Sequence, residues 1–164
     1  MSTRSATFAS VHPAQASALP ERTLWLMAVA CGACVANIFY NQPLLGDFAR
    51  DFHATPAQVG WISIAGQTGY ALGLLFFLPL GDIVERRRLV LILTTVSAGL
   101  LAATAAAPNL PLLILAHLLV GCATVGAQIL IPLAVELSPP ARRGHTVGVM
   151  MTGLLGGILL ARTL

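Results

Sequence analysis

Charged side chains are concentrated in one short stretch, "LPLGDIVERRRLVL", which covers residues 78–91. It holds five of the fifteen Asp, Glu, Lys and Arg residues of the chain, and these are Asp82, Glu85, Arg86, Arg87 and Arg88. Arginines next to an apolar run determine which side of the membrane that end of the run faces. An acid has little influence on this orientation, so the presence of Asp82 needs a separate explanation.

Polar side chains inside apolar runs form a second set of candidates, because burying them in lipid is costly. Asn37, Tyr40 and Asn41 follow the spacing i, i+3 and i+4, so they share one face of a helix that could line a substrate cavity. The alternative is that Tyr40 lies at a membrane interface and that Asn-Gln-Pro ends the helix. Further candidates for substrate binding are Gln67, His117 and Gln128.

His117 is the titratable group nearest the middle of an apolar run, and no carboxylate stands in the middle of any such run. The ordinary pKa of histidine, about 6.5, suits a proton relay, so proton coupling is one interpretation. A histidine that forms a hydrogen bond between helices is the other. Arg162 lies in the last apolar run, where it would have to face an acid or a water-filled cavity.

The sequence gives little support for a metal site, a redox site or an enzyme active site. Cys31 and Cys34 form a CxxC pair, but the sequence has no second pair or histidine cluster to complete a zinc site. They read as small packing residues, with a redox role as the alternative. We find no nucleophile–base set or phosphate-binding loop. We therefore expect no metal, no cofactor and no enzymatic activity.

Composition identifies the medium in which the chain folds. Hydrophobic residues make up 57% of it and charged residues only 9%, far below the roughly 25% of soluble domains. About 20 apolar residues span a bilayer as a helix. The charge-free runs, divided by the turn "APNLP", predict an all-α helix bundle whose spans are residues 23–44, 58–80, 88–107, 111–135 and 145–164. Residues 1–22 read as a disordered tail, with a cleaved signal peptide as the competing interpretation.

The arginines alternate between the two sides of these spans. The tail and the second and fourth loops hold seven of them, including Arg88, Arg142 and Arg143, whereas the first loop holds only Arg50. Basic residues stay on the cytoplasmic side, so the N-terminus and these two loops are predicted to be cytoplasmic. A few arginines at span ends do not form a phosphate-binding surface, so no nucleic-acid partner is expected. The bilayer is the predicted partner.

Small residues recur four positions apart within the apolar runs. Three GxxxG pairs occur, and these are Gly69 and Gly73, Gly144 and Gly148, and Gly153 and Gly157. Such faces allow two helices to approach closely in lipid. The pattern predicts a packed bundle without identifying which helices meet.

The charged stretch resembles the signature loop of the major facilitator superfamily, whose pattern is Gly-x-x-x-Asp-Arg-x-Gly-Arg-Arg/Lys. Asp82 matches the Asp of that pattern, and Arg86 and Arg87 match its two final basic positions, whereas Leu78, Ile83 and Glu85 depart from it. The segment "ELSPPARRGHTVG" is similar to the loop between the fourth and fifth spans of the family. "ANIFYNQPLLGDFARDF" and "GYALGLLFFLPLGD" resemble a bacterial branch related to drug- and sugar-efflux permeases.

This resemblance implies the N-terminal five of the twelve helices of a facilitator fold in a bacterial inner membrane. In the family, the Asp is thought to cap a helix of the second half and to favour the outward-facing state. The resemblance therefore assigns a conformational latch to Asp82, Arg86, Arg87 and Glu136, while Arg88 is interpreted as a topology anchor only.

The function that follows is transport of an unidentified small molecule by alternating access. The resemblance covers five spans, so we expect the chain to be inactive alone and to need a C-terminal half or another helix bundle as its partner. Efflux is one direction to consider. The alternative is a non-transporting remnant or a helix-bundle interaction subunit.

Overall fold

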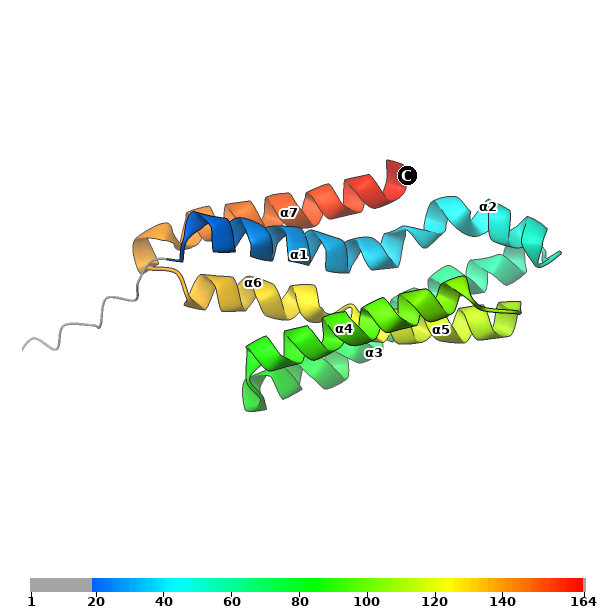
Figure 1. Cartoon of the computed structure of the whole chain (residues 1–164), viewed down its shortest axis with the longest axis horizontal. Coiled ribbons are helices and arrows are strands. Elements are labelled where there is room, and N and C mark those ends of the chain that lie inside the picture. The colour runs from blue at the N-terminus through cyan, green and yellow to red at the C-terminus, as the bar shows by residue number, and fades with distance from the viewer. Residues whose placement is uncertain (1–18, 164) are drawn as a thin grey trace, which may run out of the picture.

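A computed structural model describes residues 19–163 as a bundle of helices (Figure 1). The helices are α1 (Glu21–Phe39), α2 (Asn41–Asp51), α3 (Pro56–Ile83), α4 (Arg86–Ala105), α5 (Leu110–Ala123), α6 (Gly126–Glu136) and α7 (Arg143–Thr163), with a 3-10 turn η1 at Pro140–Arg142. The described part contains no strand, which confirms the predicted all-α class. Most of the predicted tail, residues 1–18, lies outside the described residues.

Five helical segments are long and apolar enough to cross a membrane. They are Glu21–Asp51, Pro56–Ile83, Arg86–Ala105, Leu110–Glu136 and Pro140–Thr163, so α1 with α2, and α5 with α6, each form one span. Large apolar side chains cover the outside of the bundle, and Leu26, Leu75 and Phe76 each expose more than 60% of their surface. Such an exterior suits lipid and would be poorly hydrated in water. The predicted number of spans is confirmed.

Turn residues at the ends of the spans explain where two of the helices begin. Thr55 and Gln58 form a reciprocal cap at the start of α3, and Pro56 occupies the first turn, where its missing N–H is harmless. At α5, the side chain of Asn109 accepts a hydrogen bond from the Leu112 N–H at 3.0 Å. This cap lies within the segment "APNLP", which we predicted to be a turn.

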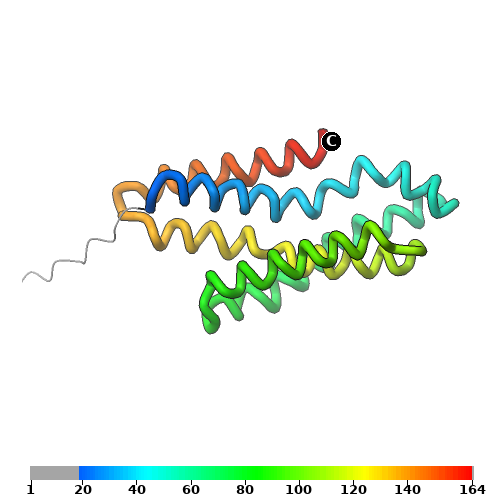
Figure 2. The backbone as a smooth tube through the Cα atoms, in the orientation of Figure 1, coloured from blue at the N-terminus to red at the C-terminus, as the bar shows by residue number. Residues whose placement is uncertain are grey.

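Two of the five spans are interrupted, although the predicted spans 23–44 and 111–135 are each continuous. For the first of them, a helix that ends at Asn-Gln-Pro was the alternative. The first breaks at Tyr40, because Pro43 lacks an N–H and crowds the carbonyl of Phe39 four residues earlier. The fourth breaks between Ala123 and Gly126, where the Thr124 hydroxyl donates to the Val120 carbonyl at 2.6 Å, a bond that bends helices. The tube in Figure 2 bends between α5 and α6.

Two glycine-rich seams hold the bundle together, since α1 packs most extensively against α7 and α3 against α5. A Cβ on Gly157 would collide with the backbone of Gly32, and a Cβ on Gly69 would collide with the Leu118 carbonyl. Backbones approach this closely only where side chains are missing. α4 packs against α5 and α6, and α6 packs against α1 and α7 (Figure 1).

Candidate functional site

Arg86 is the centre of an ion-pair network at the predicted cytoplasmic end of the bundle. Its Nη2 lies 3.0 Å from Asp82 Oδ1, and its Nη1 lies 2.7 Å from Glu136 Oε1. Its Nε donates to the Gly81 carbonyl at 3.2 Å. The guanidinium side chain is 27% exposed, whereas Asp82 and Glu136 are 73% and 60% exposed. Arg86 therefore links the turn between α3 and α4 to the end of α6.

The other arginines of the loops point into solvent. Arg87 is exposed and forms no salt bridge among the described residues, and Arg88 lies 3.8 Å from Glu85. Arg142 lies 3.9 Å from Glu21 at the start of α1, while Arg143 is exposed. Exposed pairs at such distances contribute at most about 1 kcal/mol.

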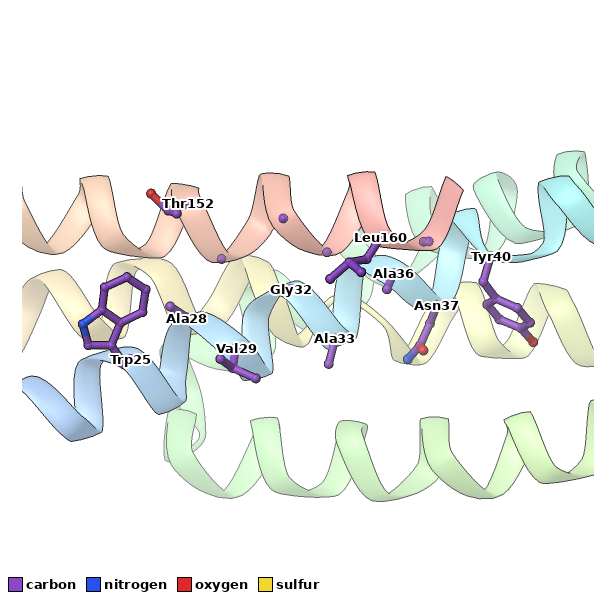
Figure 3. Close-up of a pocket in the computed structure, with 14 residues that line it drawn as sticks. Trp25, Ala28, Val29, Gly32, Ala33, Ala36, Asn37, Tyr40, Thr152 and Leu160 are labelled. Carbon is purple, nitrogen blue, oxygen red and sulfur yellow. The ribbon is translucent and has the colours of Figure 1, made fainter. Parts of the chain in front are cut away.

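A groove of about 470 Å³ runs between α1 and α7 (Figure 3). Trp25 lies at one end, while Asn37 and Tyr40 lie at the other, and small residues such as Gly156 form much of the wall between them. The groove is therefore mostly apolar with one polar end. Two of the predicted substrate residues, Asn37 and Tyr40, contribute to it.

A second cavity of about 480 Å³ adjoins the first. Asn37 and Tyr40 also line this space, together with Phe48 of α2 and Thr104 of α4. The Asn37 side-chain amide donates to the Ser97 hydroxyl at 3.3 Å. Asn37 thus connects the first span to the third while it faces two cavities.

Gln128 lines a third cavity of about 290 Å³, which Asp82 and Arg86 also line and Asn37 does not. Its amide donates to the Tyr70 hydroxyl at 2.8 Å, which joins α6 to α3. Tyr70 was not among the sequence candidates. A tyrosine in the middle of an apolar run, where its hydroxyl needs a partner, was the signal that could have identified it. Gln67, a predicted substrate residue, is exposed on α3.

Asn41 and His117 are placed inside the bundle, with only 2% of each residue exposed. The Tyr40 and Phe48 rings lie 6.3 and 6.5 Å from the His117 ring, measured between centroids. Neither Asn41 nor His117 lines the three cavities described above. Asn41 and His117 are therefore buried next to Tyr40 without lining the cavities that Asn37 and Tyr40 share.

Arg162 lies near the end of α7, and its Cζ is 5.7 Å from the centre of the Phe39 ring. A guanidinium above an aromatic face gains a modest cation–π attraction. Cys31 and Cys34 are buried free thiols. Among residues 19–163, no group of three His, Cys, Asp or Glu side chains is arranged to hold a metal ion.

These features define a multi-pass helical membrane protein with a charged loop between its second and third spans. Residues 24–164 match the Major Facilitator Superfamily, and the chain belongs to this family. The family comprises transporters rather than enzymes.

Curated relatives agree with this assignment. The chain is 50% identical over 138 residues to "Putative uncharacterized transporter YgaY" of Escherichia coli (strain K12), which covers 84% of the chain and 35% of that protein. It is 42% identical over 139 residues to "Probable transporter SCO4007" of Streptomyces coelicolor, covering 85% of the chain and 32% of that protein.

A further relative is the "3-(3-hydroxy-phenyl)propionate transporter" of Escherichia coli, which is 38% identical over 122 residues, or 73% of the chain and 30% of that protein. The chain thus spans about a third of the length of the curated relatives that it matches. No solved structure matches it at a comparable level of significance.

Proposed function

We propose that the chain supplies the first five spans of a transporter that moves a small molecule by alternating access. Family membership supports transport in general. The observation that carries the mechanism is the Arg86 network, which links the end of α6 to the turn between α3 and α4. A charged cluster that joins two segments at one membrane face can favour one of two states of a rocking bundle.

In this proposal Asp82, Arg86, Arg87 and Glu136 form the latch. Arg86 holds Asp82 through a single carboxylate oxygen, and the Asp82 side chain stays 73% exposed. An exposed carboxylate can meet the N-terminal end of a helix, where free N–H groups favour negative charge. That helix belongs to the part of the relatives that this chain does not span.

The substrate path follows the two cavities that share Asn37 and Tyr40. Their polar groups lie at the end of an otherwise apolar groove, which suits a small amphipathic molecule. Gln128 and Gln67 are further candidates on the fourth and second spans. His117 and Asn41 lie behind this surface, so they would influence the substrate only through their neighbours. Proton coupling through His117 is not part of the proposal.

The membrane orientation rests on the arginines. Arg88, Arg142 and Arg143 lie at one end of the bundle with the Arg86 network, and all three are exposed. Under the positive-inside rule this end is cytoplasmic, as is the N-terminus. We propose a bacterial inner-membrane location because the relatives are bacterial and the spans are helices, whereas proteins of the bacterial outer membrane are β-barrels.

Alternating access can be tested without a known substrate. In a chimera, this chain replaces the aligned third of the 50% identical Escherichia coli relative. All native cysteines are replaced, and a single cysteine stands at Asn37. A membrane-impermeant maleimide is applied to right-side-out and inside-out vesicles. We expect labelling mainly from outside, and a shift toward cytoplasmic labelling in Arg86→Gln.

Arg88→Gln is the matched control, since Arg88 lies in the same first turn of α4 but is 3.8 Å from Glu85 and 78% exposed. It should leave the labelling unchanged. Equal labelling from both sides that does not respond to Arg86→Gln would contradict alternating access. That result would instead favour a helix-bundle subunit without transport activity.

Transport itself is tested with the compound named for one relative, 3-(3-hydroxy-phenyl)propionate. A second chimera, built on that relative, is reconstituted in liposomes and compared with this chain alone. We expect radiolabelled compound to accumulate with the chimera and not with the chain alone. Uptake through the chain alone would refute the proposal that transport requires both halves.

A further inference from the structure

Three buried side-chain atoms among the described residues have no hydrogen-bond partner: Asn41 Oδ1, Ser63 Oγ and His117 Nε2. Buried polar atoms are paired in nearly all folded proteins, so each exception needs an explanation. The three residues come from different helices, α2, α3 and α5. One bound molecule could pair with all three atoms if the three helices meet at a single point.

The contacts of their neighbours place all three at one junction. Phe48 lies against the His117 ring, and Asn41 is two turns earlier on the same face of α2. Ser63 follows Ile62, which packs with Leu113 in one apolar cluster that also includes Phe48.

Two further contacts, one on α3 and one at the break between α1 and α2, support the same placement. A Cβ on Gly66, one turn after Ser63, would lie 3.9 Å from the His117 carbonyl oxygen. Tyr40, directly before Asn41, has its ring centroid 6.3 Å from that of His117. These contacts bring the helix segments that carry the three residues together where α2, α3 and α5 meet, just past the break at Tyr40.

Two of these atoms are acceptors that cannot bond each other. His117 Nδ1 lies 3.1 Å from the Leu113 carbonyl oxygen, which can only accept, so Nδ1 carries the proton. In the neutral ring, Nε2 is then an acceptor, and Asn41 Oδ1 is also an acceptor. The Ser63 hydroxyl has a single hydrogen, so it can serve only one of them directly. A molecule with two hydrogens can donate to both acceptors and accept from Ser63.

The charges around the junction indicate whether the bound donor is a cation or a neutral molecule. Residues 54–81 and 89–135 contain no Asp, Glu, Lys or Arg, so the α3 and α5 parts of the junction carry no acid that could neutralise a cation. Tyr40, at the break between α1 and α2, has a titratable ring that faces His117, while Ser63 of α3 and Phe48 of α2 carry no titratable group. A cation without a counter-charge is expensive at this depth. The ligand is therefore neutral.

We propose that a water molecule is bound at this junction. It donates one hydrogen to Asn41 Oδ1 and the other to His117 Nε2, and it accepts a hydrogen bond from the Ser63 hydroxyl. Three partners are typical of a buried water. The neighbouring cavity of about 480 Å³, lined by Tyr40, Phe48 and Leu113, offers an entry route. The water joins the outer segment of the first span to the second and fourth spans.

The test is NMR of the full chain in lipid nanodiscs with ¹⁵N-labelled histidine. We expect the His117 Nδ1 signal in the protonated range and the Nε2 signal in the unprotonated, hydrogen-bonded range. Magnetisation should pass from water to the His117 ring. His117→Phe assigns the signals, because they vanish in that variant.

Two substitutions, one larger and one smaller in its change of side chain, test the proposed partners of the water. Asn41→Leu should reduce the transfer from water severalfold, and Ser63→Ala, a smaller change that the fold tolerates more easily, should also reduce it. Ser97→Ala removes the partner of Asn37 elsewhere in the bundle and should leave the transfer unchanged. A protonated Nε2, no transfer in the unmodified chain, or transfer that neither Asn41→Leu nor Ser63→Ala reduces would overturn the proposal.

Discussion

Adding a single methyl group to the seam between α1 and α7 should separate these helices. A Cβ on Gly157 would collide with the Gly32 carbonyl oxygen and would lie 2.6 Å from both Cα and C of Gly32, whereas ordinary contact begins at 3.4 Å, so the backbones must move apart by at least about 0.8 Å. A gap of that size forfeits a quarter to a half of the dispersion attraction for each facing atom pair. The neighbouring Gly156 has nothing within 4 Å of its Cβ position. Gly157→Ala and Gly156→Ala therefore form a matched pair on one helix.

The two substitutions should have opposite effects on the free energy of unfolding. Gly156→Ala gains about 0.5–1 kcal/mol, because alanine loses less backbone entropy than glycine in a helix. Gly157→Ala makes the same gain but overpacks a backbone contact, which typically costs about 1–3 kcal/mol. A net difference of about 2 kcal/mol corresponds to a Tm lower by about 4–8 °C for Gly157→Ala in a chain of this size.

Thermal unfolding in dodecyl maltoside, followed by circular dichroism, measures both variants under identical conditions. Equal Tm values would refute the close backbone contact, because they would show that a methyl group fits at both positions. A lower Tm for Gly156→Ala than for Gly157→Ala would refute the assignment of α7 faces. Gly32→Ala, on the opposite side of the seam, should behave like Gly157→Ala, since its Cβ would meet the Gly153 backbone.

Three further predictions concern single polar contacts. Thr55→Ala removes the cap of α3 and should cost about 1 kcal/mol, measured as a Tm decrease of about 2–4 °C. Tyr70→Phe leaves the Gln128 amide without its acceptor and should cost about 1–3 kcal/mol, measured in the same way. Glu136→Gln breaks an exposed ion pair, so it should change stability by at most about 1 kcal/mol. In the vesicle assay, however, it should shift the maleimide labelling as Arg86→Gln does.

The sequence predicted the class, the number of spans and the membrane setting, because a long apolar run has few alternatives to a helix that crosses lipid. It offered the break at Tyr40 only as an alternative, in which Asn-Gln-Pro ends the helix, and it did not predict the break at Thr124. One depends on a proline three residues further along the chain, and the other on a hydroxyl that bonds its own helix. Both signals are local, but neither changes the apolar pattern from which spans are recognised.

The sequence was also unable to predict which helices pack against each other. The three GxxxG pairs look equivalent in the sequence, yet Gly153 and Gly157 face α1 and Gly69 and Gly73 face α5, whereas Gly144 and Gly148 have nothing within 4 Å. The spacing shows that one face of a helix carries small residues, but the tertiary arrangement decides which helix packs against that face. The same limit applies to the polar candidates, since Asn37 and Asn41 are one turn apart but only Asn37 lines a cavity.

The two basic positions of the signature loop have different environments, so they should have different roles. The guanidinium of Arg86 is engaged on three sides, by Asp82, by Glu136 and by the Gly81 carbonyl. Arg87 is exposed and unpaired among residues 19–163. Because Arg86 contacts Asp82 through Oδ1, that carboxylate keeps Oδ2 for another donor while its orientation is fixed. In the proposed latch, Arg86 can therefore contact Asp82 while Asp82 contacts a second helix, and the exposed Arg87 can pair with an acid in the part of the transporter that this chain does not span.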